Sequence, residues 1–173
     1  MMDARSPLEC HLYIDLNPCL CGGRVEQTDH RLTMINDRLC AKYAARCSAC
    51  ASEIEYLFAL SDDIVPPECF GGSTPSTIID AGQYMATSEL AARQVSMPLT
   101  TEEARGRARY WLGRAVACID EVMKWIPDGA EEVPEAAFFT PVGRQNRDRE
   151  PGRFRRIRLA AVHRAYRQIL IEL

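Results

Sequence analysis

The chain has 173 residues, and its 21 Lys and Arg residues against 24 Asp and Glu residues give a formal net charge of −3. With 47% hydrophobic and 26% charged residues, the composition suits a chain that buries a core, and it excludes a disordered or collagen-like protein. No stretch approaches the roughly 20 apolar residues that a bilayer requires. The first residues lack the basic and apolar run of a signal peptide, so we expect a cytoplasmic protein without a membrane partner.

The charge is distributed unevenly along the chain. Residues 1–65 carry six basic and ten acidic side chains, residues 66–141 carry six and eleven, and residues 142–173 carry nine and three. The body is therefore acidic and the C-terminal segment is basic. Because an acidic body repels phosphate backbones, the charge pattern disfavours broad nucleic-acid binding.

The alternation of apolar and polar residues predicts strands over the first sixty residues. The expected strands are residues 11–16, 31–35, 38–43 and 53–60, with Asn36-Asp37 as a turn between the second and the third. This order predicts an antiparallel, meander-like sheet.

The spacing of the cysteines points to a metal site, since a chain expected in the reducing cytosol is unlikely to rely on disulfides. Residues 17–23, Asn-Pro-Cys-Leu-Cys-Gly-Gly, form a Cys-x-Cys turn, and residues 46–50, Arg-Cys-Ser-Ala-Cys, form a Cys-x-x-Cys turn. Two such turns supply four soft ligands, the tetrahedral set that zinc prefers. The predicted ligands of one Zn²⁺ are Cys19, Cys21, Cys47 and Cys50. Four protein thiolates close the coordination shell, so the predicted zinc is structural.

Residues 10–60 resemble a zinc ribbon, a family in which two cysteine-bearing turns lie at the tips of β-hairpins and the metal replaces a hydrophobic core. The sequence departs from the usual pattern in its Cys-x-Cys spacing and in Ala51, which stands where a glycine usually follows the second turn. Cys40, His11 and His30 are possible substitute ligands, but we expect Cys40 to be a strand residue facing the core. The remaining cysteines lack a paired partner nearby and are expected to be small buried hydrophobes: Cys10, Cys69 and Cys118.

A redox role for the Cys47–Cys50 motif is disfavoured. Thioredoxin-like sites place this motif at the N-terminus of a helix. Here the strand pattern of residues 53–60 follows instead.

The second half of the chain is predicted to be helical. After a connector rich in proline and glycine at residues 65–75, a helix over residues 78–95 opens near Asp80 and is ended by Met97-Pro98. Residues 100–103, Thr-Thr-Glu-Glu, read as a capping box that starts a long helix with one apolar face, and Pro127-Asp128-Gly129 stops it. An acidic connector covers residues 130–143, and a last helix is expected from near Pro151 almost to Leu173.

The last helix is predicted to be amphipathic. The residues expected on its apolar side are Phe154, Ala161, Val162, Ala165, Tyr166, Ile169, Leu170 and Leu173. The opposite side gathers the basic residues Arg153, Arg156, Arg164 and Arg167. These arginines either form a solvated face that docks on acidic stretches of the same chain, or form a ladder that binds an anionic partner.

The predicted fold class is α+β, with an antiparallel zinc-ribbon-like sheet in residues 1–65 and two or three packed helices in residues 66–173, the two regions forming one compact unit. No nucleophile elbow, His-Glu-x-x-His motif, Walker lysine or dinucleotide fingerprint is present. The sequence therefore favours a binding role over catalysis, with an enzyme of unrecognised site ranked last.

The order of motifs along the whole chain resembles small uncharacterised bacterial proteins of the toxin-immunity kind. The motifs are Asn-Pro-Cys-x-Cys-Gly, Cys-x-x-Cys, Phe-Gly-Gly followed by Ile-Ile-Asp-Ala-Gly-Gln, and Pro-Gly-Arg-Phe-Arg-Arg. This resemblance implies a zinc-stabilised protein that binds and neutralises a toxin partner, and the acidic body would suit a basic toxin. The alternative is a nucleic-acid-binding regulator that uses the zinc ribbon and the Arg-rich last helix.

Overall fold

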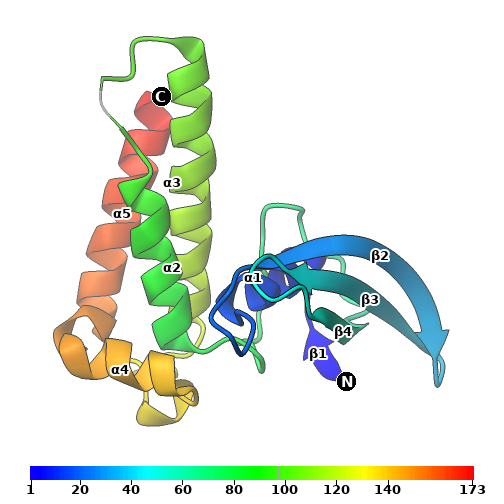
Figure 1. The fold of residues 1–173 in the computed structure, drawn as a ribbon. Coiled ribbons are helices and arrows are strands. Elements are labelled where there is room, and N and C mark those ends of the chain that lie inside the picture. Colours follow the sequence, from blue (N-terminus) through cyan, green and yellow to red (C-terminus); the bar gives the residue numbers. More distant parts are fainter. Residues whose placement is uncertain (97) are drawn as a thin grey trace. The chain divides into compact units, whose positions relative to one another are not determined.

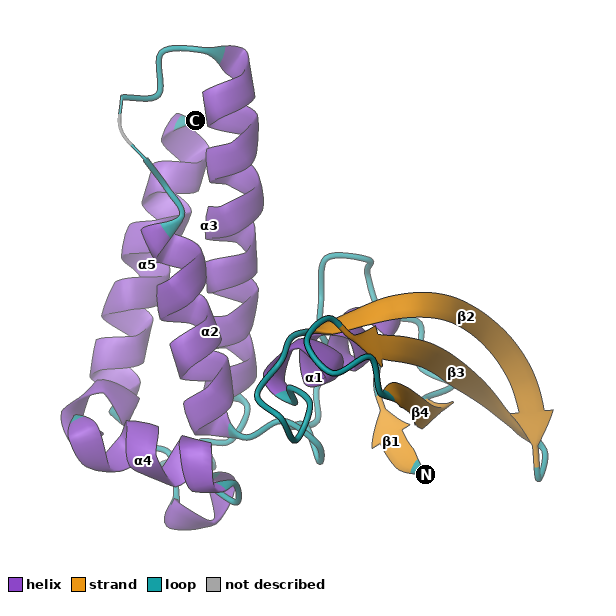
Figure 2. Ribbon diagram, viewed as in Figure 1, coloured by secondary structure: helices purple, strands orange, loops and turns teal. Residues whose placement is uncertain are grey.

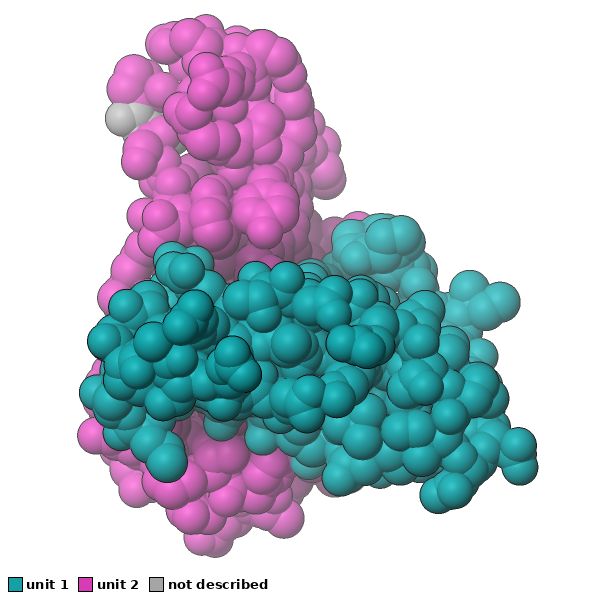
Figure 3. Space-filling view, turned by 45° about the vertical axis from the view of Figure 1, so that its right-hand side comes forward, with its two compact units in different colours: residues 1–72, 76–78 teal, residues 73–75, 79–173 magenta. Residues whose placement is uncertain are grey.

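The structure is a computed structural model that describes residues 1–96 and 98–173, so Met97 of the predicted Met97-Pro98 helix stop lies outside the described residues. The chain divides into two compact units, shown in separate colours in Figure 3. Unit 1 comprises residues 1–72 and 76–78, and unit 2 comprises residues 73–75 and 79–173. In the described part of the chain, no helix has the length and apolar character needed to cross a membrane.

Unit 1 contains a four-stranded sheet with the order β1-β4-β3-β2 (Figures 1 and 2). Its strands are β1 (Met2–Ala4), β2 (Val25–Ile35), β3 (Arg38–Cys47) and β4 (Glu53–Leu60). The antiparallel meander of β2, β3 and β4 confirms the strands predicted at residues 31–35, 38–43 and 53–60. β1, which was not predicted, pairs with β4 in parallel. Asn36 and Asp37 have φ values of 50° and 59°, so they form the predicted two-residue turn with the left-handed backbone that suits a hairpin.

The strand predicted at residues 11–16 is wrong, because these residues belong to helix α1 (Pro7–Leu16). The hydroxyl of Ser6 accepts a 3.1 Å hydrogen bond from the backbone N–H of Glu9, and Pro7 occupies the first turn. Both features are typical of a helix start. Leu12 and Ile14 are both buried, which gave the segment an apparent two-residue period although its backbone is helical.

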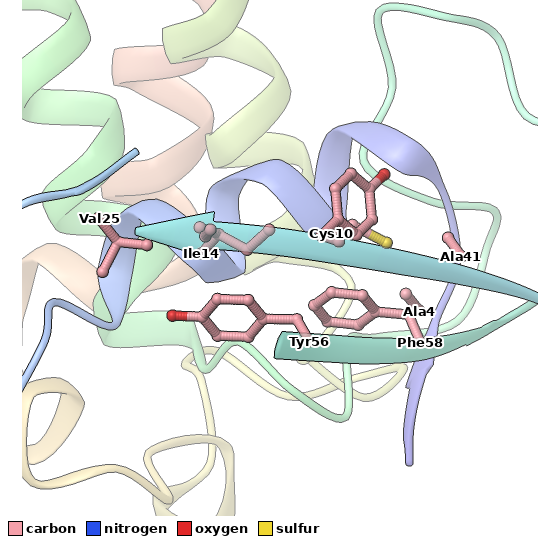
Figure 4. Close-up of a cluster of buried hydrophobic side chains, with 9 residues drawn as sticks. Ala4, Cys10, Ile14, Val25, Ala41, Tyr56 and Phe58 are labelled. Carbon is pink, nitrogen blue, oxygen red and sulfur yellow. The ribbon is translucent and has the colours of Figure 1, made fainter. Parts of the chain in front are cut away.

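α1 and the sheet share a hydrophobic core, part of which is drawn in Figure 4. The buried residues of this cluster are Ala4, Cys10, Ile14, Val25, Ala41, Tyr43, Ala45, Tyr56 and Phe58. The rings of Tyr43 and Phe58 meet edge to face with centroids 5.8 Å apart, and neither side chain is exposed. Burial of the Phe58 side chain contributes about 1.5–3 kcal/mol. Unit 1 therefore has a real apolar core, and a metal would add to this core rather than replace it.

Unit 2 is built on α3 (Glu102–Met123), which packs against both α2 (Ala81–Arg93) and α5 (Arg156–Glu172). The predicted apolar face of α3 is confirmed, with the buried residues Ala108, Leu112, Ala115, Ile119 and Val122. The helix begins one residue later than the predicted capping box implied. Thr101 is the N-cap, and its hydroxyl accepts a 3.1 Å hydrogen bond from the N–H of Ala104.

Helix α4 (Pro141–Arg149) lies partly in the predicted acidic connector, and α2 and α4 share the carboxylate of Asp80. Asp80 is fully buried and accepts a 2.9 Å hydrogen bond from the N–H of Gln83 in α2. It also accepts hydrogen bonds of 2.8 and 2.7 Å from the N–H and the hydroxyl of Thr140, the N-cap of α4. A Cβ at Gly143 would lie 1.9 Å from an Asp80 oxygen, so only glycine fits there. One side chain thus fixes the start of two helices.

The apolar face predicted for the last helix is partly wrong. Pro151 opens a short 3₁₀ turn (Pro151–Phe154), and α5 starts only at Arg156. Arg155 between them is extended, with φ −74° and ψ 137°, so counting 100° per residue from Pro151 gives the wrong helical phase. Leu159 is the buried residue of α5, whereas Ala161, Ala165 and Ile169 are exposed.

Candidate metal centre

The first cysteine-bearing turn, residues 17–24, follows α1 and leads into β2. The carbonyl of Cys19 accepts a 2.7 Å hydrogen bond from the N–H of Gly22, whose φ of +82° suits glycine. The N–H of Gly23 lies 3.4 Å from the sulfur of Cys21 and donates to it. A Cβ at Gly23 would lie 2.6 Å from the sulfur of Cys47, whereas one at Gly22 would meet no atom within 4 Å. Gly22 is therefore needed for the backbone of the turn, and Gly23 for its approach to the second turn.

The second turn, residues 47–52, connects β3 and β4. The carbonyl of Cys47 accepts a 3.0 Å hydrogen bond from the N–H of Ala51, and the sulfur of Cys47 accepts one of 3.4 Å from the N–H of Ala49. Ala51 has a φ of +59°, which explains why glycine is the usual residue at this position. The hydroxyl of Ser52 lies 3.1 Å from the sulfur of Cys50.

Hydrogen bonds join the two turns directly. The N–H and the hydroxyl of Ser48 both donate to the carbonyl of Arg24, at 2.9 and 3.1 Å. The two turns are therefore held against each other by the polypeptide itself. A site organised in this way loses less conformational entropy when a metal binds than two free loops would lose.

The structure brings the four predicted cysteines together. Their sulfur atoms all lie within 4.8 Å of one another. The distances are 3.6 Å between the sulfurs of Cys19 and Cys50 and 3.5 Å between those of Cys21 and Cys47. A tetrahedron with Zn–S bonds of about 2.3 Å has S···S edges of about 3.8 Å, whereas a disulfide requires about 2.05 Å. The cluster could hold a metal ion, and its size and four thiol donors suit zinc.

The burial of the four thiols is unequal. Cys47 is buried, Cys19 is half-buried, and Cys21 and Cys50 are exposed. The site lies at the protein surface with one side in the interior. Because all four donors come from the chain, a bound ion has no open coordination position, as expected for a structural metal and not for a catalytic one.

Neighbouring groups shift the pKa values of the thiols in opposite directions. The hydroxyl and backbone of Ser52 donate to Cys50 and lower its pKa to about 6. Backbone N–H groups in the second turn likewise lower the pKa of Cys47. For Cys21, the Gly23 N–H acts to lower the pKa, but the three neighbouring cysteines outweigh it and raise the pKa to about 12. These directions describe the metal-free protein, in which the pKa values of Cys47 and Cys50 are lowered and that of Cys21 is raised.

The alternative ligands lie outside the cluster. Cys40 is fully buried, and its sulfur lies 3.5 Å from the carbonyl oxygen of Arg38 and 3.6 Å from the sulfur of Met1. His30 stacks on the ring of Tyr43 with centroids 4.4 Å apart, and His11 meets the same ring edge to face at 5.3 Å. Cys40 is thus the core-facing strand residue that was expected, and both histidines pack on an aromatic ring.

Sequence reasoning missed the residues that support the site. Ser52 follows the second cysteine pair by two positions, and the Arg24 carbonyl and Ser48 form the link between the turns. The Arg46 guanidinium adds a 3.3 Å hydrogen bond to the carbonyl of Ala51. The glycine pair after Cys21 was the visible signal for the close approach. The contact of Ser48 with Arg24 depends on the fold and has no sequence signature.

The four arginines of the predicted partner surface do not form one exposed ladder. Arg153 pairs with Glu89 and donates a 3.0 Å hydrogen bond to the carbonyl of Asn146. The guanidinium of Arg156 donates two hydrogen bonds of 2.9 Å, to the carbonyls of Ala130 and Pro127. Arg164 and Arg167 are exposed on α5.

No protein-family model, no curated protein and no solved structure matches the chain. The resemblances to zinc ribbons and to toxin-immunity proteins therefore rest on the sequence motifs alone. The four-cysteine cluster is supported by the distances between its sulfur atoms.

Proposed function

We propose that the chain is a zinc-stabilised protein-binding module without catalytic activity. The observation that supports this proposal best is the meeting of four cysteine sulfurs within 4.8 Å on two turns. A Zn²⁺ ion bound there would tie the turn after α1 to the turn between β3 and β4. It would fix the end of the sheet and supply no chemistry of its own.

The proposed ligand set has a test with a matched control. Both Cys40 and Cys47 are buried on β3, so a serine at either position introduces the same change in a similar environment. Elemental analysis of the purified wild-type protein is expected to give about one zinc per chain. Cys47→Ser should lose the metal and Cys40→Ser should keep it. The opposite result would show that the ligand set is wrong.

A protein partner is supported by charge and by exposed apolar surface. Unit 1 contains six basic and eleven acidic residues, and its β2–β3 hairpin exposes Leu32, Met34 and Leu39. In its specific form, we propose an immunity or inhibitor protein whose acidic surface captures a basic toxin, since opposite charge accelerates association. Affinity capture from the native host, with a Leu32→Glu variant as the control, should identify a basic protein retained by the wild type alone.

The alternative, a nucleic-acid-binding regulator, would need the arginines of the last helix. The partners already made by Arg153 and Arg156 leave Arg164 and Arg167 as the exposed pair of that set. We expect only weak binding to DNA or RNA, erased by salt. Sub-micromolar affinity at physiological salt that is lost in the Arg164→Glu, Arg167→Glu double variant would favour the regulator, with about one unit of log–log salt slope lost per phosphate contact.

A further inference from the structure

β2 is the outermost strand of its sheet, and its outer edge has no strand partner among the described residues. The strand is 11 residues long, and the seven side chains from Glu26 to Leu32 are all exposed. Such an edge presents a row of backbone N–H and C=O groups that can pair with another strand. Proteins protect such edges by shortening or covering them, or by charged side chains and bulges. β2 carries charged residues and one bulge, but it is long and, in the described part of the chain, uncovered.

The same edge carries apolar side chains. Leu32 is 57% exposed and Met34 is 62% exposed. Met34 pairs across the hairpin with Leu39, which is 40% exposed, and Leu32 pairs with Ala41. Directly paired residues share a face of the sheet, and Ala41 belongs to the core under α1. The apolar face of the sheet therefore continues beyond α1 to the free edge.

The backbone of β2 can pair with a second strand around His30. Asn36 and Asp37 form a two-residue turn, so the closing pair Ile35–Arg38 is hydrogen-bonded, and bonded pairs alternate from there. By this alternation the N–H and C=O groups of His30, Leu32 and Met34 face away from β3. A bulge between Gln27 and Asp29 interrupts the ladder next to His30. In the single chain the N–H of His30 donates a 2.9 Å hydrogen bond to Oδ1 of Asp29. Pairing about His30 exchanges this bond for one to the backbone carbonyl of the second copy, so the association is modest.

The sequence of β2 is complementary to itself when two copies run antiparallel about His30. Asp29 then lies opposite Arg31 of the second copy, and Arg31 lies opposite Asp29. Within one chain these two side chains already form an ion pair at 3.3 Å. The dimer would bring together four side chains of alternating charge. A shift of each strand by one pairing step would set Arg31 against Arg31, which is unfavourable.

We propose that the protein forms a symmetric homodimer in which two copies pair antiparallel through the free edges of β2, centred on His30. The four strands of each copy then form one continuous sheet. The strand that occupies the edge is β2 of a second copy of this chain, because two antiparallel copies of β2 place opposite charges against each other. This inference does not require the proposed zinc or toxin. Leu32 and Met34 would belong to both contact surfaces, so dimerisation is measured on the purified chain without a partner.

The test uses reciprocal charge exchange in the purified 173-residue protein. Asp29→Arg sets arginine against arginine at both contacts, and Arg31→Asp sets aspartate against aspartate. Each single variant should weaken the dimer by about ten- to a hundred-fold in Kd. An equimolar mixture of the two variants restores opposite charges at both contacts and should form a heterodimer. The double variant Asp29→Arg, Arg31→Asp should dimerise by itself.

Sedimentation velocity over a range of protein concentrations measures these outcomes. The wild type should approach twice the 19.5 kDa chain mass as concentration rises, and Asp62→Arg, an equal change of charge in an exposed loop, should behave like the wild type. Unchanged thermal melts and far-UV circular dichroism spectra show that the variants are folded. A wild type that stays monomeric, a dimer that survives both single exchanges, or a mixture that stays monomeric would each overturn the proposal.

Discussion

Replacing Ala51 by glycine should stabilise the protein, although such a change usually destabilises a folded chain. Ala51 has a φ of +59°, and a left-handed conformation costs a residue with a Cβ roughly 1–2 kcal/mol. Glycine avoids this cost but loses about 0.5–1 kcal/mol through its greater freedom in the unfolded chain. The net effect lies between about 0 and 1.5 kcal/mol, and its central value of about 0.75 kcal/mol corresponds to about 1.5–3 °C in Tm for a chain of this size.

Urea unfolding of the zinc-loaded protein, followed by far-UV circular dichroism, measures this gain. Ala49→Gly provides the matched control, because Ala49 lies in the same turn and is not among the residues with positive φ. Its replacement should lower stability by about 0.5–1 kcal/mol. The two substitutions are therefore expected to have opposite signs. Equal destabilisation by both would show that Ala51 is not strained and would refute the argument.

Three further predictions concern the site and the helical unit. Gly23→Ala places a Cβ 2.6 Å from the sulfur of Cys47. It should weaken zinc binding at least tenfold, as measured by a competition titration with a chelator. Gly152→Ala adds a Cβ that meets no atom within 4 Å and should leave zinc binding unchanged. Zinc affinity should rise with pH, because the metal-bound site holds fewer protons than the metal-free site. The proton of Cys21, which has a pKa of about 12, opposes zinc binding across the neutral range. The proton of Cys50, which has a pKa of about 6, opposes it mainly at acid pH. An affinity that does not change between pH 6 and 8 would contradict thiolate ligation. Leu112→Asp buries a charge at a position that is 3% exposed and should lower the free energy of unfolding of unit 2 by more than about 3 kcal/mol. Ile169→Asp, at a position that is 41% exposed, should lower it by less than half as much in the same denaturation assay.

The candidate site was predictable because its signal is local. Two short motifs, Cys19 to Gly23 and Cys47 to Cys50, contain all four donors, and metal geometry limits how such motifs can meet. The hairpin at Asn36-Asp37 and the long helix α3 could also be predicted, because a turn type and a 3.6-residue period are properties of contiguous sequence. What these motifs could not show was the backbone strain at Ala51, which depends on the chain path.

The missed elements depend on contacts between distant residues. α4 is short and polar, and it begins where Thr140 meets the carboxylate of Asp80, sixty residues earlier in the chain. α1 is buried on more than one side, so its apolar residues do not follow a single helical stripe. The phase of α5 was lost at Arg155, where one extended residue separates a 3₁₀ turn from the helix. In each case tertiary packing outweighs the local pattern.

The apolar core of unit 1 decides what loss of the metal should do. Small zinc modules unfold without their ion because the metal stands in for a core. Here α1 covers the sheet through a cluster that includes the fully buried Tyr43 and Phe58, and the two turns are also joined by Ser48 and Arg24. Removal of zinc should therefore free residues 17–24 and 47–52 and leave the strands paired. Hydrogen exchange of the chelated protein should show faster exchange in these turns and retained protection at the centres of β3 and β4. Loss of protection across the whole sheet would show that the metal, and not the aromatic core, holds unit 1 together.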